Sequence, residues 1–152
     1  MIDGVISILK DDSTLTTDVG LNKAGTTVKV YPVVCPQGEE MPYIICAITG
    51  CSEKECKDII GHPQDETFDI LVYAKNYTDV SAIELRAIEI LTEFSGNSSD
   101  SHISEIILQT HRDLFDNDRK AYVRVASFKG SGFFFSDIVT AFTTGFSLGF
   151  RS

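Results

Sequence analysis

The feature that most constrains the fold is a change in hydrophobic periodicity between residues 68 and 94. Apolar residues first alternate with a period of two, which predicts a strand with one buried face: Phe68, Ile70, Val72 and Ala74. Directly afterwards they recur at three- and four-residue intervals, which predicts an amphipathic helix: Val80, Ile83, Ala87, Ile90, Leu91 and Phe94. Thr78 is a candidate N-cap for this helix, and Gly96 is a residue that would end it. The segment therefore predicts a strand followed at once by a helix.

The other segments add one helix and four strands. Apolar residues at helical spacing predict a short N-terminal helix over Ile2–Leu9. Residues rich in β-branched and aromatic side chains predict strands over Val28–Val34, Tyr43–Thr49, Ile103–Leu108 and Ala121–Phe128. This order, α-β-β-β-α-β-β, predicts an α+β fold with a mostly antiparallel sheet of four to five strands and two helices packed on one face.

The C-terminal segment is unusually aromatic. Gly130-Ser131-Gly132 is typical of a hinge, and six of the ten phenylalanines follow it: Phe133, Phe134, Phe135, Phe142, Phe146 and Phe150. We therefore divide the chain into a domain over residues 1–129 and an extension over residues 130–152. Exposing so much apolar area is costly, so we expect either the domain's own sheet or a neighbouring subunit to cover it.

Charge and composition exclude several classes of function. The formal net charge is -9, with 22 acidic against 13 basic residues, and this excludes nucleic-acid binding by the whole surface. The first residues lack the basic region and cleavage site of a signal peptide. No apolar run is long enough to predict a membrane span.

Four residues in one region raise the question of a metal site. Cys46, Cys51, Cys56 and His62 offer three sulfurs and one imidazole, but no two of the cysteines are spaced as C-x-x-C. We expect free thiols and predict no metal, no cofactor and no catalytic residues; a small metal- or ligand-binding domain that uses these four side chains remains the alternative.

Several motifs, taken in order, resemble a known family. A helix over Ile2–Leu9 precedes Val28-Lys29-Val30-Tyr31-Pro32; Pro36-Gln37-Gly38 then leads into Met41-Pro42-Tyr43-Ile44-Ile45. Thr67-Phe68-Asp69-Ile70-Leu71-Val72-Tyr73-Ala74 is followed directly by the helix that ends at Phe94. Over residues 2–128 this pattern resembles the tail-completion, or tail-terminator, proteins of long-tailed bacteriophages.

The resemblance implies a virion structural protein with no enzymatic activity. Such a subunit assembles with itself into a ring, commonly a hexamer, in the tail-neck region after synthesis in the host cytoplasm. The ring caps the tail tube protein, stops its polymerisation and offers a surface to the head completion or connector protein. DNA would pass through the lumen without specific binding, and Asp116 and Asp118 are candidate lumen residues. The six C-terminal phenylalanines are candidate interface residues; another phage neck or tail-tube subunit is the alternative.

Overall fold

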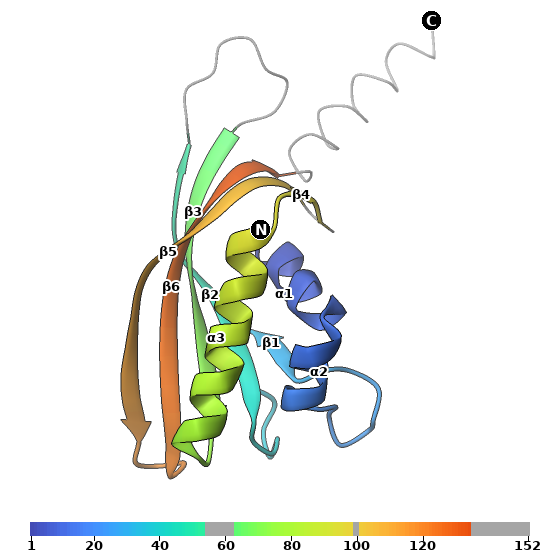
Figure 1. Ribbon diagram of the computed structural model, residues 1–152, viewed down its shortest axis with the longest axis vertical. Coiled ribbons are helices and arrows are strands. Elements are labelled where there is room, and N and C mark those ends of the chain that lie inside the picture. The colour runs from blue at the N-terminus through green and yellow to red at the C-terminus, as the bar shows by residue number, and fades with distance from the viewer. Residues whose placement is uncertain (54–62, 99–100, 135–152) are drawn as a thin grey trace, which may run out of the picture.

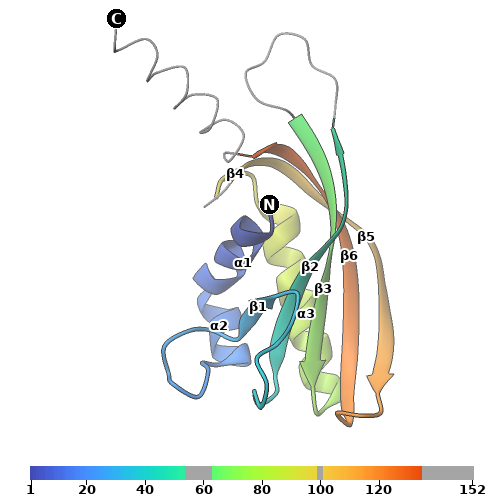
Figure 2. The same cartoon turned by 180° about the vertical axis from the view of Figure 1, so that it is seen from behind.

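The computed structural model describes residues 1–53, 63–98 and 101–134. Within these ranges the elements are, in order, α1 (Ile2–Asp11), α2 (Ser13–Val19), β1 (Val30–Pro32), β2 (Tyr43–Glu53), β3 (Pro63–Ala74), α3 (Tyr77–Glu93), β4 (Gly96–Asn97), β5 (Ser101–Asp116) and β6 (Ala121–Phe134). The strands form one sheet, and the three helices lie together on one side of it (Figures 1 and 2).

The sheet is mixed and strongly curled. Its strand order is β1-β2-β3-β6-β5-β4; β1 runs parallel to β2, and each of the other neighbouring pairs is antiparallel. The upper ends of β5 and β6 bend over the helices in Figure 1, so that the sheet resembles half of a barrel around them. The prediction of an α+β fold with a mostly antiparallel sheet is confirmed.

The predicted numbers of elements were too low. The described residues hold three helices and six strands, whereas the sequence predicted two helices and four to five strands. The additional helix α2 begins where the Asp12 side chain accepts a hydrogen bond from the Leu15 N–H at 2.8 Å. The additional strand β4 has two residues and forms only by pairing with His102 and Ile103 of β5. Such a pairing leaves no periodic signal in the sequence.

The hydrophobic core lies between the helices and the face of the sheet that they cover. Phe68 of β3 stacks on Phe128 of β6 at its centre, with ring centroids 5.3 Å apart. Buried side chains of all three helices complete it, including Val5, Leu9, Leu15, Val80 and Leu91. The prediction that β3 has one buried face is confirmed, because its four even-numbered apolar residues face this core.

The glycines at the expected hinge lie inside a strand. β6 continues to Phe134, and Gly130 and Gly132 pair with both neighbouring strands. A Cβ atom at Gly132 would lie 2.1 Å from the carbonyl oxygen of His102, and one at Gly130 would lie 2.5 Å from the sulfur of Met1. These glycines are thus explained by close approach of neighbouring atoms and not by flexibility.

Candidate assembly surface

One edge of the sheet is a long strand with little cover. β5 pairs with β6 along nearly its whole length, but on its other side β4 covers only His102 and Ile103 among the described residues. The register shifts between Ile103 and Glu105 and between Leu108 and Thr110, so the regular part of this edge is Thr110–Asp116. Its free N–H and C=O groups can accept a further strand.

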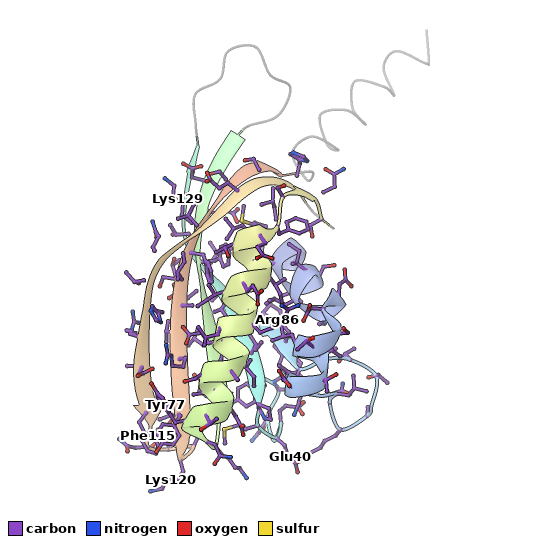
Figure 3. The ribbon with its side chains drawn as sticks, in the orientation of Figure 1. Glu40, Tyr77, Arg86, Phe115, Lys120 and Lys129 are labelled. Atoms are coloured by element: carbon purple, nitrogen blue, oxygen red, sulfur yellow. The ribbon has the colours of Figure 1, made fainter. Side chains whose placement is uncertain are left out.

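Exposed apolar side chains gather at the lower end of this edge. Phe115 and Tyr122 pair across β5 and β6, and the Tyr122 ring meets the Phe115 ring edge-on at 5.2 Å and the Tyr77 ring at 5.8 Å. Tyr77 and Phe115 lie beside each other in Figure 3. Leu114 is exposed on the opposite face of the same strand. We call Tyr77, Leu114, Phe115 and Tyr122 the β5 patch.

The opposite edge of the sheet is also partly open. β1 pairs only with Ile44, Ile45 and Cys46, so residues 47–53 of β2 have no strand on that side within the described ranges. Val33 donates its N–H to the Cys46 carbonyl at 2.9 Å, which places it next to this open stretch. Val33, Val34 and Ile48 have 68%, 70% and 45% of their surface exposed, respectively. We call these three residues the β1–β2 patch.

The turn between β5 and β6 holds the two predicted lumen residues. The Asp116 carboxylate accepts the backbone N–H groups of Asp118 and Arg119 at 3.0 and 3.1 Å, which fixes the turn. Arg119 and Lys120 lie in the same turn, so its two acids are balanced by two bases. Arg119 also lies over the Tyr43 and Tyr73 rings, 5.9 and 5.5 Å from their centroids. The prediction that Asp116 and Asp118 line a lumen remains a prediction.

An ion cluster with a buried centre joins α3 to the two long strands. Glu84 of α3 is fully buried and forms an ion pair with Arg124 of β6. The Arg124 guanidinium also contacts Asp113 of β5 at 2.8 Å, and it lies within hydrogen-bonding distance of His111 Nδ1, at 2.9 Å. The Tyr77 hydroxyl donates to the Asp113 carboxylate at 3.0 Å, so the cluster also positions one residue of the β5 patch.

Sequence reasoning missed this cluster, although one signal was available. Glu84 lies four residues after Val80 and three before Ala87, which places a carboxylate within the buried stripe of α3. A charge at a buried position requires a partner of opposite charge. Arg124, which lies in the predicted strand over Ala121–Phe128, was a candidate for the partner of this carboxylate.

The predicted interface residues lie at or beyond the end of the described chain. Phe133 and Phe134 belong to β6 by their backbone. Phe135, Phe142, Phe146 and Phe150 lie outside the described residues. Their role as an interface remains a prediction, as does the division of the chain at residue 129.

The cysteine and histidine group is only partly described. Cys46 is buried in β2, and burial raises the pKa of its thiol to about 12, whereas Cys51 is exposed further along the strand. Cys56 and His62 lie outside the described residues. Among the residues that the structure does describe, no group of three or more His, Cys, Asp or Glu side chains could hold a metal ion. Within the same residues, no helix is long and apolar enough to cross a membrane.

The fold defines the class of this protein as an α+β domain with a curled, mixed sheet and a helical layer on its inner side. No protein-family model and no curated protein matches the sequence. Among solved structures, a chain of the "Virion of native gene transfer agent (GTA) particle" is similar, with a TM-score of 0.63 and 16% sequence identity. The match covers 86% of this chain and 92% of that chain, so the two share a fold over nearly their whole lengths.

Proposed function

We propose that this chain is a structural protein of a phage-like virion that forms a ring at the end of the tail tube. The ring stops tube polymerisation and offers the surface to which the head connector binds. Two observations support the proposal: the fold is shared with a component of a gene transfer agent virion, and the described chain exposes apolar patches at both edges of one sheet. The exposed patches are the observation that supports assembly into a ring.

The two patches suit a head-to-tail contact between copies. The β5 patch and the β1–β2 patch lie toward opposite edges of the sheet, with β3 and β6 between β2 and β5. When the β5 patch of one copy meets the β1–β2 patch of the next, the contact is heterologous, and a heterologous contact that closes gives a ring. The open stretches of β5 and β2 would supply backbone hydrogen bonds to the same contact. We expect a closed oligomer of six chains.

The acidic charge fits a ring through which DNA passes. A lumen with few Lys or Arg side chains offers little to hold phosphate, and the net charge of -9 favours such a lumen. In this proposal the partners are the tail tube protein and the head completion or connector protein. The protein resides in the neck of the virion and is assembled in the host cytoplasm.

Electron microscopy and light scattering of the purified protein test the proposal. The expected result is closed rings of uniform size, which bind to the ends of isolated tail tubes. Long tubes formed by this protein alone would instead identify a tail-tube subunit, which is the alternative within the same class. A protein that stays monomeric and does not bind tube ends would contradict both.

A metal-binding domain is the alternative from a different class. The sequence observation that favours it is the group Cys46, Cys51, Cys56 and His62. Elemental analysis of protein purified without chelators would show about one zinc per chain if these side chains form a structural site. We expect no stoichiometric metal.

A further inference from the structure

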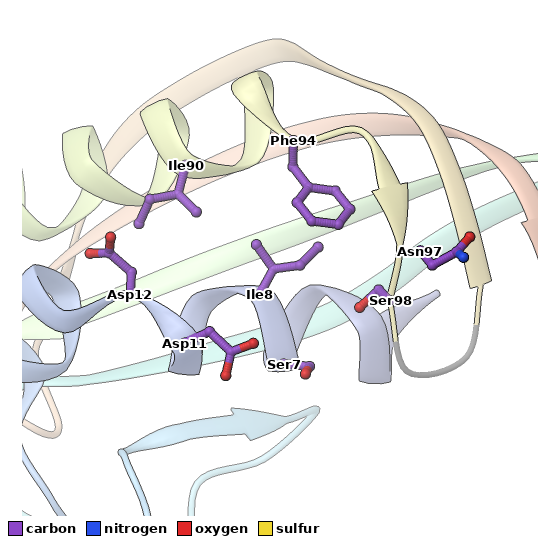
Figure 4. A pocket seen from close by; sticks show the side chains of 8 residues that line it. All are labelled: Ser7, Ile8, Asp11, Asp12, Ile90, Phe94, Asn97 and Ser98. Atoms are coloured by element: carbon purple, nitrogen blue, oxygen red, sulfur yellow. The ribbon is translucent and has the colours of Figure 1, made fainter.

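A groove of about 530 Å³ runs between α1 and α3 on the outer side of the helical layer (Figure 4). Its floor is apolar, because Ile8 of α1 faces Ile90 and Phe94 of α3. Its rim is polar and is formed by Ser7, Asp11, Asp12, Asn97 and Ser98. A groove of this size, with an apolar floor and a polar rim, suits an amphipathic segment.

Two polar contacts involve residues of the groove rim. In the first contact, Arg86 of α3 binds the Asp12 carboxylate at 2.7 Å. In the second contact, the Ser98 hydroxyl donates to the Gly4 carbonyl at 3.0 Å. The first contact joins α3 to the residue that follows α1, and the second joins α1 to the residue that follows β4, so tertiary contacts link the elements that form the groove.

The described chain ends beside this groove. Phe134, the last described residue of β6, pairs with Ser101 of β5. Ser101 follows Ser98 of the groove rim by three residues, and β4, which includes Asn97 of the rim, pairs with the same end of β5. The described chain therefore ends near the mouth of the groove.

The sequence of residues 135–152 has the composition of a groove ligand. Ile138, Val139, Phe142 and Phe146 recur at intervals of one, three and four residues, and only Asp137 and Arg151 carry charged side chains. Apolar residues at such intervals are the anchors of segments that bind hydrophobic grooves.

We propose that residues 135–152 bind in the α1–α3 groove of their own chain, with phenylalanine side chains against Ile8, Ile90 and Phe94. The groove of the same chain is favoured because the described chain ends next to it, and a short connection gives a high effective concentration. This inference does not depend on the proposed ring. The sequence left two roles open for the aromatic segment: packing against its own domain and contact with a neighbouring subunit. This inference assigns it the first role.

Cross-linking of the full-length chain tests the proposal. Asp11→Cys on the groove rim is combined with Phe142→Cys, and a short bismaleimide joins thiols that lie close together. The matched control combines Phe142→Cys with Glu40→Cys, because Glu40 is exposed at the far end of the molecule in Figure 3. Buried Cys46 is kept, and the other native cysteines are replaced by serine: Cys35, Cys51 and Cys56.

The expected result is an intrachain product, identified by peptide mass spectrometry, at about tenfold higher yield for the Asp11 variant than for the Glu40 variant. Equal yields would overturn the proposal. A product between two chains would also overturn it, and would place the segment on a neighbouring copy. If Asp11→Cys does not fold, Ser7→Cys on the same rim replaces it. Light scattering of the same samples reports separately whether the ring forms.

Discussion

Arg124 of β6 and Glu84 of α3 form an ion pair at a place where their side chains are only 12% and 1% exposed, respectively. Both charged groups are largely shielded from water, so each requires the opposite charge of the other for its stabilisation. The pair joins α3 to β6, and Arg124 reaches Asp113 on β5 as well. The helix is thus fixed to the part of the sheet that carries the β5 patch.

Removal of Glu84 should therefore destabilise the fold strongly. We expect Glu84→Ala to lower the free energy of unfolding by about 3 kcal/mol, because Arg124 remains in place with part of its charge uncompensated. Urea unfolding followed by circular dichroism measures the change. Glu89→Ala is the matched control on the same helix: Glu89 is exposed and pairs with Arg86, and its loss should cost less than about 1 kcal/mol. Equal losses of unfolding free energy in the two variants would show that the buried pair contributes no more to stability than the exposed pair.

The β5 patch should govern assembly without governing stability. Leu114→Lys places a charge on the proposed contact, and we expect the closed oligomer to dissociate while the urea midpoint of the subunit changes little. Leu85→Lys is the control, because Leu85 is exposed on α3 and belongs to neither patch. Light scattering behind a sizing column measures both variants. Dissociation by the control but not by Leu114→Lys would move the contact away from the β5 edge.

Gly132 should tolerate substitution less well than Gly130. A Cβ atom at Gly132 would meet backbone of β5, whereas one at Gly130 would meet the end of the flexible Met1 side chain. We expect Gly132→Ala to lower the free energy of unfolding by about 3 kcal/mol and Gly130→Ala by about 1 kcal/mol. Thermal unfolding of the two variants checks the order. A hinge at these positions would instead tolerate both substitutions equally.

Asp12 should make stability depend on pH in the acid range. The hydrogen bond from Arg86, followed by that from the Leu15 N–H, holds the pKa of the Asp12 carboxyl below its ordinary value of 3.8. Because the folded pKa is the lower one, the carboxylate stabilises the fold above pH 3.8, and this contribution is lost as the pH falls through the folded pKa.

The Asp12→Asn variant tests this dependence. Asn can still accept the Leu15 N–H but cannot form an ion pair with Arg86. We expect the wild type to be more stable than Asp12→Asn at neutral pH, and the difference to shrink in acid. Urea unfolding at about pH 7 and about pH 2.5 measures both proteins. A difference that stays constant or widens in acid would assign the role of Asp12 to capping alone.

The sequence by itself determined the elements whose apolar residues keep one period throughout. The alternation from Phe68 to Ala74 and the helical stripe from Val80 to Leu91 predicted β3 and α3, since each side chain's direction is set by its own backbone. The helix began slightly earlier than predicted, at Tyr77 with Asn76 as its N-cap instead of Thr78.

Only the tertiary structure decided the features that join distant segments. β4 exists because two residues meet β5, and the polar stretch from Thr110 to Asp113 is a strand because β6 pairs with it. The glycines predicted as a hinge lie within β6 because they pair with β3 and β5, and atoms of Met1 and His102 leave little room for a side chain there. The ion pair of Glu84 and Arg124 and the two open sheet edges likewise depend on contacts between residues far apart in the chain. Local periodicity carries no information about such contacts, because it reports the face on which a side chain lies and not what it meets there.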